Sequence, residues 1–346
     1  MQTIELHKVK IVDRRPVIVA LILLIFVGGL VAYKTTGSLA VLANVQTNGI
    51  YKARFDLFQP GASWQGALNR TFSYFVVIWP ALLFGILISS AVRTFVSPEW
   101  LARLFGGGRM RQQLFAGLAG TPLMLCSCCV APVFAGVYER TERLAPSLAL
   151  MLAAPSLNPA ALILTFMLFG GKVGAIRLVI GIVAVLITGL FAERFADSRN
   201  ISCRTGPKDF QANRSVSAGL VLSIIRVAVQ TLPLIVLGVV LSMLITWWLP
   251  ESGLETAVSG TVAVVLFAFV ATLIAMPTFF ELPLTLLFVS AGLPFGVAMA
   301  ILIAGPATNL PSLLTVGRLA GWRPAVLVGI SVWILSIMGG LLIGLV

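Results

Sequence analysis

Charged side chains are scarce in this chain. Asp, Glu, Lys and Arg make up 10% of its 346 residues, whereas hydrophobic residues make up 59%. A soluble domain usually carries about 25% charged residues. The shortage of charge therefore argues against a soluble protein and indicates a protein that lies largely in lipid.

Histidine, cysteine and nucleotide-binding motifs are also few or missing. The one histidine, His7, lies in the N-terminal tail, which excludes a metal site built from histidines. No G-x-x-x-x-G-K-[ST] sequence occurs, so the chain has no P-loop with which to use ATP itself. Four cysteines are too few for a disulfide framework in a chain of this length. We therefore predict neither a cofactor nor an enzymatic activity.

The abundant feature is the long apolar run. Two examples are "PVIVALILLIFVGGLVAY" (16–33) and "AVLVGISVWILSIMGGLLIGLV" (325–346). Each is long enough to cross a hydrocarbon core of about 30 Å as a helix. The first run is longer than the apolar part of a typical signal peptide, and the "KTTG" that follows is a poor cleavage context. The sequence thus predicts an all-α polytopic membrane protein with an uncleaved anchor helix near its N-terminus.

The two halves of the chain resemble each other. Two prolines and an asparagine recur at the same spacing, as Pro132, Pro155 and Asn158 in the first half and Pro283, Pro306 and Asn309 in the second. The second set follows the first by 151 residues, and "WPALLFG" (79–85) has a similar counterpart upstream in the second half, "LPLIVLG" (232–238). We predict one repeat over 71–193 and another over 219–346, after an N-terminal anchor helix and loop at 1–70.

Loop charges predict that these repeats are inverted. The chain has 24 basic and 12 acidic residues, and in a membrane protein Lys and Arg collect in cytoplasmic loops, so we expect no nucleic-acid partner. If 113–138 crossed the membrane fully, the basic linker 194–218 would lie outside. If 113–138 is a re-entrant hairpin, the linker and the N-terminus are both cytoplasmic, and 247–255, which has no Lys or Arg, lies outside. With a second hairpin at 260–289, each repeat contains a helix, a hairpin and two further helices.

This arrangement is typical of transporters. Inverted repeats place the substrate site near the bilayer midplane, where broken helices meet. Irregular backbone at that depth is tolerated only if it is buried in protein or lines a wet cavity. The hairpin tips would be "GTPLMLCSCCVAP" (120–132) and "ATLIAMPTFFELP" (271–283). Since proline removes a backbone donor, we expect helix breaks at Pro132, Pro155, Pro283 and Pro306.

Cys126, Cys128 and Cys129 stand within four positions of the first predicted tip. The second half has no cysteine at the corresponding positions, so the thiols are not part of the repeated scaffold. Cysteine is often a small buried hydrophobic residue. Three cysteines at a helix break, however, indicate soft ligands for Cu(I), Zn or As(III). A vicinal Cys128–Cys129 disulfide would be strained, and Cys203 in the basic linker is expected to be an exposed thiol.

Glu281 is the only carboxylate that falls deep in a predicted membrane segment. An intramembrane acid is a functional-site hypothesis by default. Its counterpart in the first repeat is Val130, directly after the cysteines, so we predict that Glu281 faces the thiols and couples transport to protons. The alternative is a snorkelling position near the mouth of the hairpin. Arg177 and Arg226 lie near predicted helix ends and are also expected to snorkel.

Asn158 and Asn309 each follow a helix-breaking proline by three residues. Their side chains can cap backbone groups that the break leaves unpaired, or they can line the substrate site. Weaker candidates for substrate contacts are Ser127, Thr121 and Thr272.

The motifs "CSCCVAP", "LAAPSLNPA" and a second "GPATN", in this order, resemble the arsenical efflux permease family (ArsP), which includes the YraQ-type predicted permeases. The resemblance covers about 70–345 and implies a permease of the bacterial inner membrane. Some members export trivalent organoarsenicals, with the cysteines of a C-x-C motif implicated. Carried over, that motif is Cys126 and Cys128. Where this chain has Cys129, the family usually has glycine, so a third thiol joins the ligand set.

The leading hypothesis is a secondary permease that exports a soft, thiol-reactive metalloid or metal species, with the three cysteines as its ligands and Glu281 as the proton-coupling residue. One alternative is a permease for a small sulfur-containing anion, bound at hairpin helix N-termini. Another is a membrane thiol-redox protein, which would need a reversible Cys126–Cys128 disulfide. The expected partners are a small-molecule or metalloid substrate and the lipid bilayer, and the sequence is compatible with a homo-oligomer.

Overall fold

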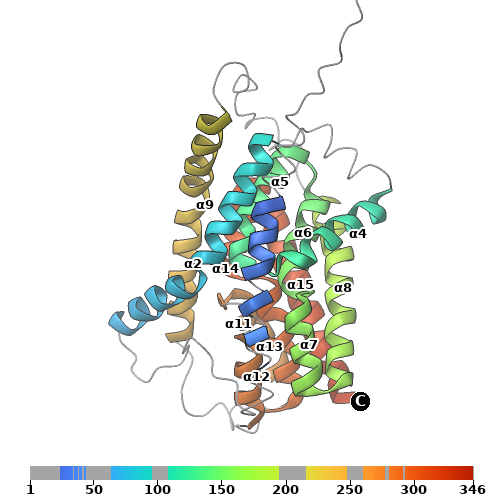
Figure 1. Cartoon of the computed structure of the whole chain (residues 1–346). Coiled ribbons are helices and arrows are strands. Elements are labelled where there is room, and N and C mark those ends of the chain that lie inside the picture. Colours follow the sequence, from blue (N-terminus) through green and yellow to red (C-terminus); the bar gives the residue numbers. More distant parts are fainter. Residues whose placement is uncertain are drawn as a thin grey trace, which may run out of the picture.

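The computed structural model describes parts of 24–43 and the ranges 64–95, 108–194, 216–247, 260–276, 280–290 and 293–345. Its long elements are all helices, shown in Figure 1. They are α2 (Trp64–Phe95), α4 (Arg109–Gly120), the 3-10 turn η1 (Thr121–Leu123), α5 (Ser127–Thr141), α6 (Leu144–Ser156), α7 (Pro159–Phe169), α8 (Gly171–Arg194), α9 (Val216–Trp247), α11 (Thr261–Leu273), α12 (Glu281–Ser290), α13 (Phe295–Ala307), α14 (Leu310–Ala320) and α15 (Trp322–Leu345). The N-terminal tail, most of the basic linker with Cys203, and residues 248–255 of the predicted outer loop lie outside the described residues.

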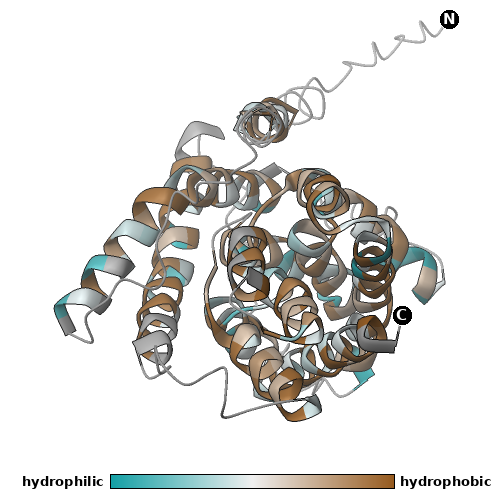
Figure 2. Ribbon diagram, turned by 90° about the horizontal axis from the view of Figure 1, so that it is seen from below, coloured by the Kyte–Doolittle hydropathy of each residue, from teal (hydrophilic) through white to brown (hydrophobic). Residues whose placement is uncertain are grey.

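Four of the described helices are long and apolar enough to cross a membrane: α2, α8, α9 and α15. Two bent pairs bring the number to six if each pair is one span: α6 with α7, bent by 42°, and α13 with α14, bent by 45°. Seen end-on, the helices gather side by side and are hydrophobic over most of their length (Figure 2). Large apolar side chains such as Phe72 and Val229 are exposed on the outside, as lipid contact requires. The prediction of an all-α polytopic membrane protein is confirmed.

The repeat is visible in the helix boundaries. The helices α13, α14 and α15 begin and end 151 residues after α6, α7 and α8 respectively. Equal lengths and equal breaks follow from the same apolar runs interrupted by the same proline and asparagine. The two halves are therefore copies of one structural unit.

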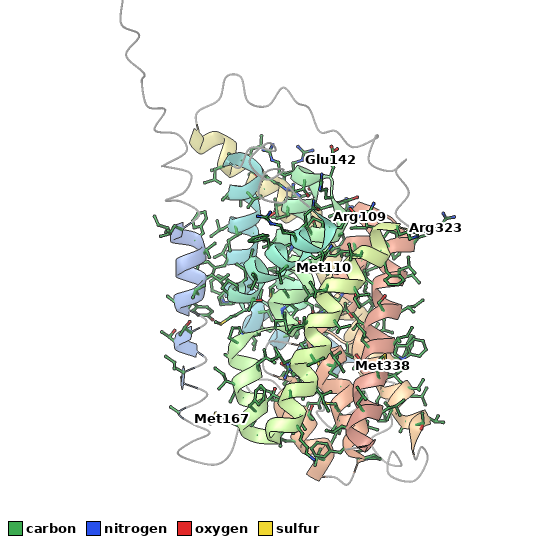
Figure 3. The ribbon with its side chains drawn as sticks, turned by 90° about the vertical axis from the view of Figure 1, so that its right-hand side faces the viewer. Arg109, Met110, Glu142, Met167, Arg323 and Met338 are labelled. Atoms are coloured by element: carbon green, nitrogen blue, oxygen red, sulfur yellow. The ribbon has the colours of Figure 1, made fainter. Side chains whose placement is uncertain are left out.

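The two units run in opposite directions. Met167, shortly before α8, lies at the lower edge of the molecule in Figure 3, whereas Arg323, in the first turn of α15, lies near the upper edge. The chain then returns to the lower edge, where α15 ends beside the C-terminus (Figure 1). Because α8 and α15 are equivalent helices, their opposite directions make the repeat an inverted one.

The cysteine-bearing segment is re-entrant. Arg109, at the start of α4, and Glu142, directly after α5, both lie near the upper edge of the molecule (Figure 3). Between them the helix ends at Gly120, passes through η1, and reverses at Met124, whose φ of 49° lies in the left-handed region. The two arms of this segment, α4 and α5, both pack against α6. The segment therefore enters the bundle and leaves it on the same side.

The prediction that Pro132 breaks a helix is wrong. The helix α5 runs from Ser127 to Thr141 with Pro132 inside it, and the break lies upstream, at 121–126. A proline removes one backbone hydrogen bond, and the close packing of α5 against α2, α6 and α14 outweighs that loss. The other prolines lie at helix ends: α6 and α13 each end one residue after Pro155 and Pro306, and Pro283 stands in the first turn of α12.

The inverted repeats and the positive-inside rule together predict which helix ends face the cytoplasm. In a Cys203→Ser background, we expect cysteines introduced at Glu142 and Arg323 to react with a membrane-impermeant maleimide from the cytoplasmic side. A cysteine at Lys172, in the first turn of α8, should react from the opposite side.

The Cys203→Ser parent is the control and should stay unlabelled, because its remaining cysteines are buried. Reaction of the Glu142 and Lys172 positions from the same side would contradict the topology.

Candidate functional site

The three cysteines meet where the first hairpin reverses. Cys126 is the N-cap residue of α5, with extended backbone (φ −70°, ψ 160°), and Cys128 and Cys129 lie in the first turn of the helix. On a continuous helix, neighbouring side chains point to different sides. The extended residue at Cys126 removes this restriction, so the three thiols converge.

The sulfur atoms lie close together and are not joined by covalent bonds. The Cys126 and Cys128 sulfurs are 3.2 Å apart, the Cys128 and Cys129 sulfurs are 3.8 Å apart, and all three lie within 4.8 Å of one another. A disulfide bond would require about 2.05 Å, and all three cysteines are free and buried. Two sulfurs bound to one ion at about 2.3 Å each lie about 4 Å apart. The spacing therefore suits a shared soft ion, and Cys128 and Cys129 do not form the vicinal disulfide that was expected to be strained.

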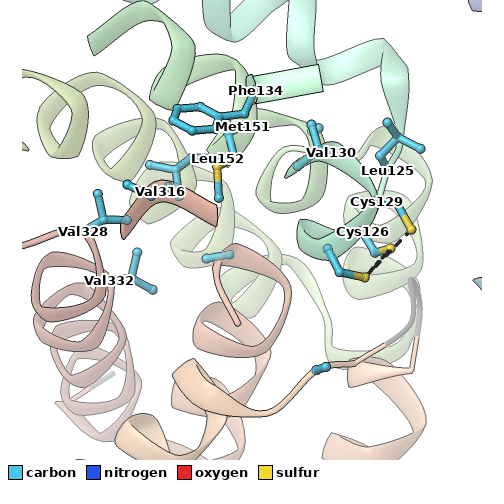
Figure 4. Close-up of a cluster of buried hydrophobic side chains, with 14 of the residues drawn as sticks. Leu125, Cys126, Cys129, Val130, Phe134, Met151, Leu152, Val316, Val328 and Val332 are labelled. Atoms are coloured by element: carbon cyan, nitrogen blue, oxygen red, sulfur yellow. Dashed lines mark hydrogen bonds between the residues drawn. The ribbon is translucent and has the colours of Figure 1, made fainter. Parts of the chain in front are cut away.

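The thiols lie at the edge of the main apolar core. In Figure 4 the sulfurs of Cys126 and Cys129 lie at the right-hand side of the cluster of buried side chains, and dashed lines mark the sulfur contacts. All five tip residues from Leu125 to Cys129 are at most 4% exposed. The three thiols are thus buried together at the end of a helix break.

Tyr74 is a site residue that the sequence did not reveal. It lies on α2, is fully buried, and its hydroxyl oxygen is 3.1 Å from the sulfur of Cys128. The two residues are 54 positions apart, and a tyrosine in an apolar span carries no motif that connects it to a distant thiol. Its contact orients one thiol of the three.

Gly85 explains how α2 approaches the tip so closely. A Cβ atom at this position would clash with the carbonyl oxygen of Cys129, because it would come closer than real Cβ contacts do. Only glycine leaves room for the backbone of the cysteine turn. The helix α2 therefore positions the thiols both through the hydroxyl of Tyr74 and through this backbone contact.

The prediction that Arg177 snorkels to the membrane surface is wrong. Arg177 is 2% exposed, and its guanidinium forms an ion pair of 3.0 Å with the carboxylate of Glu281. It also donates a hydrogen bond of 2.6 Å to the hydroxyl of Thr165. The pairing has a physical reason, because an unpaired buried charge is far more costly than a paired one. Glu281 is buried as predicted by its place in the sequence, and its partner comes from α8 in the other repeat.

This polar triad breaks the symmetry of the repeat. The positions equivalent to Thr165, Arg177 and Glu281 are Val316, Val328 and Val130, all fully buried. The same fold therefore accepts either three polar side chains or three valines at these positions. An ionisable group in a membrane segment is a functional-site hypothesis by default, so the triad is a candidate site that only one half of the chain carries.

The two asparagines cap the helices that follow the breaks. The side-chain oxygen of Asn158 accepts hydrogen bonds from the backbone N–H groups of Ala160 and Ala161, at 3.1 and 3.4 Å. That of Asn309 accepts one from the N–H of Ser312 at 3.1 Å, as part of a capping box. The amide nitrogens of both asparagines are buried without a partner in the described part of the chain. Each residue thus caps a helix and still has donors to offer.

The weaker candidates divide into two kinds. Thr121 and Thr272 donate to carbonyls of their own helices, Gly117 and Ala268, at 3.0 and 3.1 Å. Ser127, between the cysteines, has a buried hydroxyl for which the described residues provide no partner. Of the three, Ser127 is therefore the one free to contact a bound molecule.

Comparison with known proteins shows which family the sequence of this chain matches. The ArsP_1 family, described as "Predicted permease", matches residues 63–345. The UPF0718 protein YraQ of Escherichia coli is 30% identical over 277 residues, which cover 78% of this chain and 79% of that protein. The UPF0718 protein MJ0584 of Methanocaldococcus jannaschii is 23% identical over 333 residues, covering 77% of this chain and 91% of its own length. No solved structure matches the chain.

The contact between Gly85 and the cysteine turn predicts a specific effect of a methyl group. Gly85→Ala should destabilise the protein by about 1–3 kcal/mol, because the added carbon forces backbone apart in a packed interior. It should also separate the thiols and reduce their joint binding of phenylarsine oxide, a dithiol reagent.

Gly171→Ala is the matched control, since a Cβ there has no heavy atom within 4 Å. Thermal unfolding and reagent binding of the two purified variants check the prediction. A Gly85→Ala protein that behaves like the control would contradict the role given to this glycine.

Proposed function

This chain belongs to the ArsP_1 family of predicted permeases, and we propose that it is a secondary permease that exports a soft, thiol-reactive metalloid species such as a trivalent (organo)arsenical. Its family and its apolar helices make it a multi-pass membrane permease that acts on a small-molecule substrate within the bilayer. In the proposal, the membrane is the bacterial inner membrane, the N-terminus is cytoplasmic, and transport is coupled to protons.

One observation carries the proposal: three free thiols are buried together at the turn of a re-entrant hairpin. Thiolates are soft ligands and select soft acceptors over the hard ions abundant in a cell. Substrate sites in inverted-repeat transporters are built where broken helices meet. A sulfur cluster at such a break therefore supports a soft substrate rather than a structural role.

The number of thiols supports a range of substrates. An inorganic trivalent arsenic accepts three sulfur ligands, whereas a monomethyl form has two positions open. Cys126 and Cys128, 3.2 Å apart, would hold the monomethyl form, and Cys129 would complete the set for the inorganic form. Asn158, Asn309 and Ser127 have hydrogen-bond capacity left for the substrate or its hydroxyl groups.

Proton coupling is assigned to the pair of Glu281 and Arg177. In a low-dielectric interior, a proton that binds Glu281 removes its attraction to Arg177, and loss of one partner of a buried pair costs about 3–5 kcal/mol. A cost of that size is enough to favour a different arrangement of α8 and α12. In the proposal, the ion pair is the link between the two repeats that a proton switches.

A thiol-redox protein is the second candidate, favoured by the 3.2 Å between the sulfurs of Cys126 and Cys128. Such a protein cycles between dithiol and disulfide, whereas a permease keeps its thiols reduced. Counting free thiols before and after turnover separates the two functions.

Replacement of the thiols tests the substrate site. Cys126→Ser and Cys128→Ser should each abolish trivalent arsenical uptake into inverted vesicles, because serine keeps the size but offers a hard, protonated oxygen. Cys129→Gly should keep transport and shift the preference from inorganic to monomethyl arsenic.

Cys203→Ser is the matched control and should transport normally. All variants should reach the membrane in similar amounts, since serine fits the same space. Full transport by the Cys126→Ser/Cys128→Ser double variant would refute the sulfur site.

Replacement of Glu281 tests the coupling. Glu281→Gln keeps the shape and a hydrogen bond to Arg177 but cannot exchange a proton, so we expect it to lose transport driven by a proton gradient and to keep substrate exchange. Uptake and exchange assays in the same vesicles measure the two activities.

Glu139→Gln is the control. Glu139 also pairs with an arginine, Arg93, at 2.8 Å, but its side chain is 36% exposed, so its replacement should leave both activities intact. Uphill transport by Glu281→Gln at the wild-type rate would remove Glu281 from the coupling step.

A further inference from the structure

A small cavity lies next to the polar triad, between α6, α8, α13 and α15. It has room for about one water-sized molecule. Its lining includes Ser156 at the end of α6, Arg177 and Gly181 on α8, and Ala307 at the end of α13. The cavity thus lies at the breaks of the two bent spans, where α6 and α13 end.

The cavity lies on the axis that relates the two repeats. Three lining residues of the first half, Ser156, Gly181 and Ala184, have their exact counterparts in the same lining, and these are Ala307, Val332 and Leu335. A cavity lined by equivalent residues from both halves must straddle the pseudo-twofold axis. In inverted-repeat transporters this axis is where ligands bind.

The polar groups that face the cavity are hydrogen-bond donors without partners. The Nε of Arg177 and the hydroxyl of Ser156 are both buried and unpaired within the described ranges. Ser156 is 6% exposed and Arg177 is 2% exposed. Thr308 and the amide nitrogens of Asn158 and Asn309, one or two residues from the lining, are unpaired as well. Buried unpaired donors point to a ligand that accepts hydrogen bonds.

We propose that Arg177 and Ser156 form a binding site for a small inorganic monoanion of halide size, in competition with the carboxylate of Glu281. The carboxylate occupies one edge of the guanidinium, at 3.0 Å, as an internal substitute for the anion. When Glu281 loses its charge, Arg177 is left as an unpaired cation beside a donor-lined cavity. This site goes beyond the proposed function, because it needs neither the thiols nor a metalloid.

Charge balance decides when the anion binds. With Glu281 ionised, the site is neutral, and an added anion would leave a buried net charge, which is costly. With Glu281 protonated, anion and guanidinium pair, and the site is neutral again. A proton and an anion therefore bind together, and neither binds tightly alone.

No other titratable group in the described helices around α8 replaces Glu281 in this role. The helices α6, α7 and α13 have no charged residue. On α4, α8 and α15, every charged residue except Arg177 lies in the first or last turn of its helix. These residues are Arg109, Arg111, Lys172, Glu193, Arg194 and Arg323. Anion binding should therefore follow the protonation of Glu281.

The test measures chloride binding by the full-length purified protein in detergent, from the line broadening of the chloride NMR signal in a gluconate buffer. Glu281→Gln should bind chloride at least about tenfold more tightly than the wild type at neutral pH, because its Arg177 is always available to the anion. Wild-type affinity should rise as the pH falls, and that of Glu281→Gln should not change.

A variant that folds without the site completes the test. The triple change Thr165→Val, Arg177→Val and Glu281→Val copies the three valines of the other half, which this fold already accepts. It should remain monodisperse and lose chloride binding. Arg226→Gln, which removes an exposed arginine on α9, should bind like the wild type.

Two results would overturn the site: chloride affinity of Glu281→Gln no higher than that of the wild type, or chloride binding that survives in the triple valine variant. Cys126→Ser/Cys128→Ser should keep chloride binding, so failure of the thiol site and failure of the anion site are seen in different experiments.

Discussion

A helix that is broken inside a membrane must find partners for the backbone groups it leaves unpaired, and the structure depends on meeting this requirement. Asn158 and Asn309 meet it with their side chains, each capping the helix that starts after a break. At the first hairpin, Met124 reverses the chain in a left-handed conformation and α5 starts anew at Ser127. Because two of the breaks are capped by asparagine and the cysteine turn is buried in the packed core, the chain can place irregular backbone in the middle of an apolar bundle.

The breaks are repeated, whereas the chemistry is not. The helices α6, α7 and α8 recur as α13, α14 and α15 with the same boundaries. The thiols and the ion pair of Arg177 with Glu281 each occur once, and valines take the place of the triad in the other half. A symmetric scaffold thus carries side-chain chemistry that differs between its two halves.

Sequence reasoning succeeded where the signal was local or periodic. Apolar runs, loop charge and the repeated prolines with Asn158 and Asn309 led to the membrane class and to inverted repeats. It failed at Pro132 because the packing of α5 on its neighbours outweighs both the hydrogen bond that a proline removes and the steric strain that its ring adds. It failed at Arg177 because an arginine near a helix end is expected at the membrane surface. Its buried partner, Glu281, is 104 residues away in the sequence.

Composition and residue spacing are enough to show that this protein lies in a membrane, that its halves are related, and that three cysteines stand within four positions. These properties follow from composition and residue spacing, and they can be recognised without knowing any contact between distant residues. The packing of the helices was needed to show that Tyr74 contacts Cys128 and that Gly85 leaves room for the cysteine turn. It was also needed to show that Glu281 pairs with Arg177 and that residues of both repeats line one cavity. Those relations depend on how helices pack, and packing brings together residues that no sequence spacing connects.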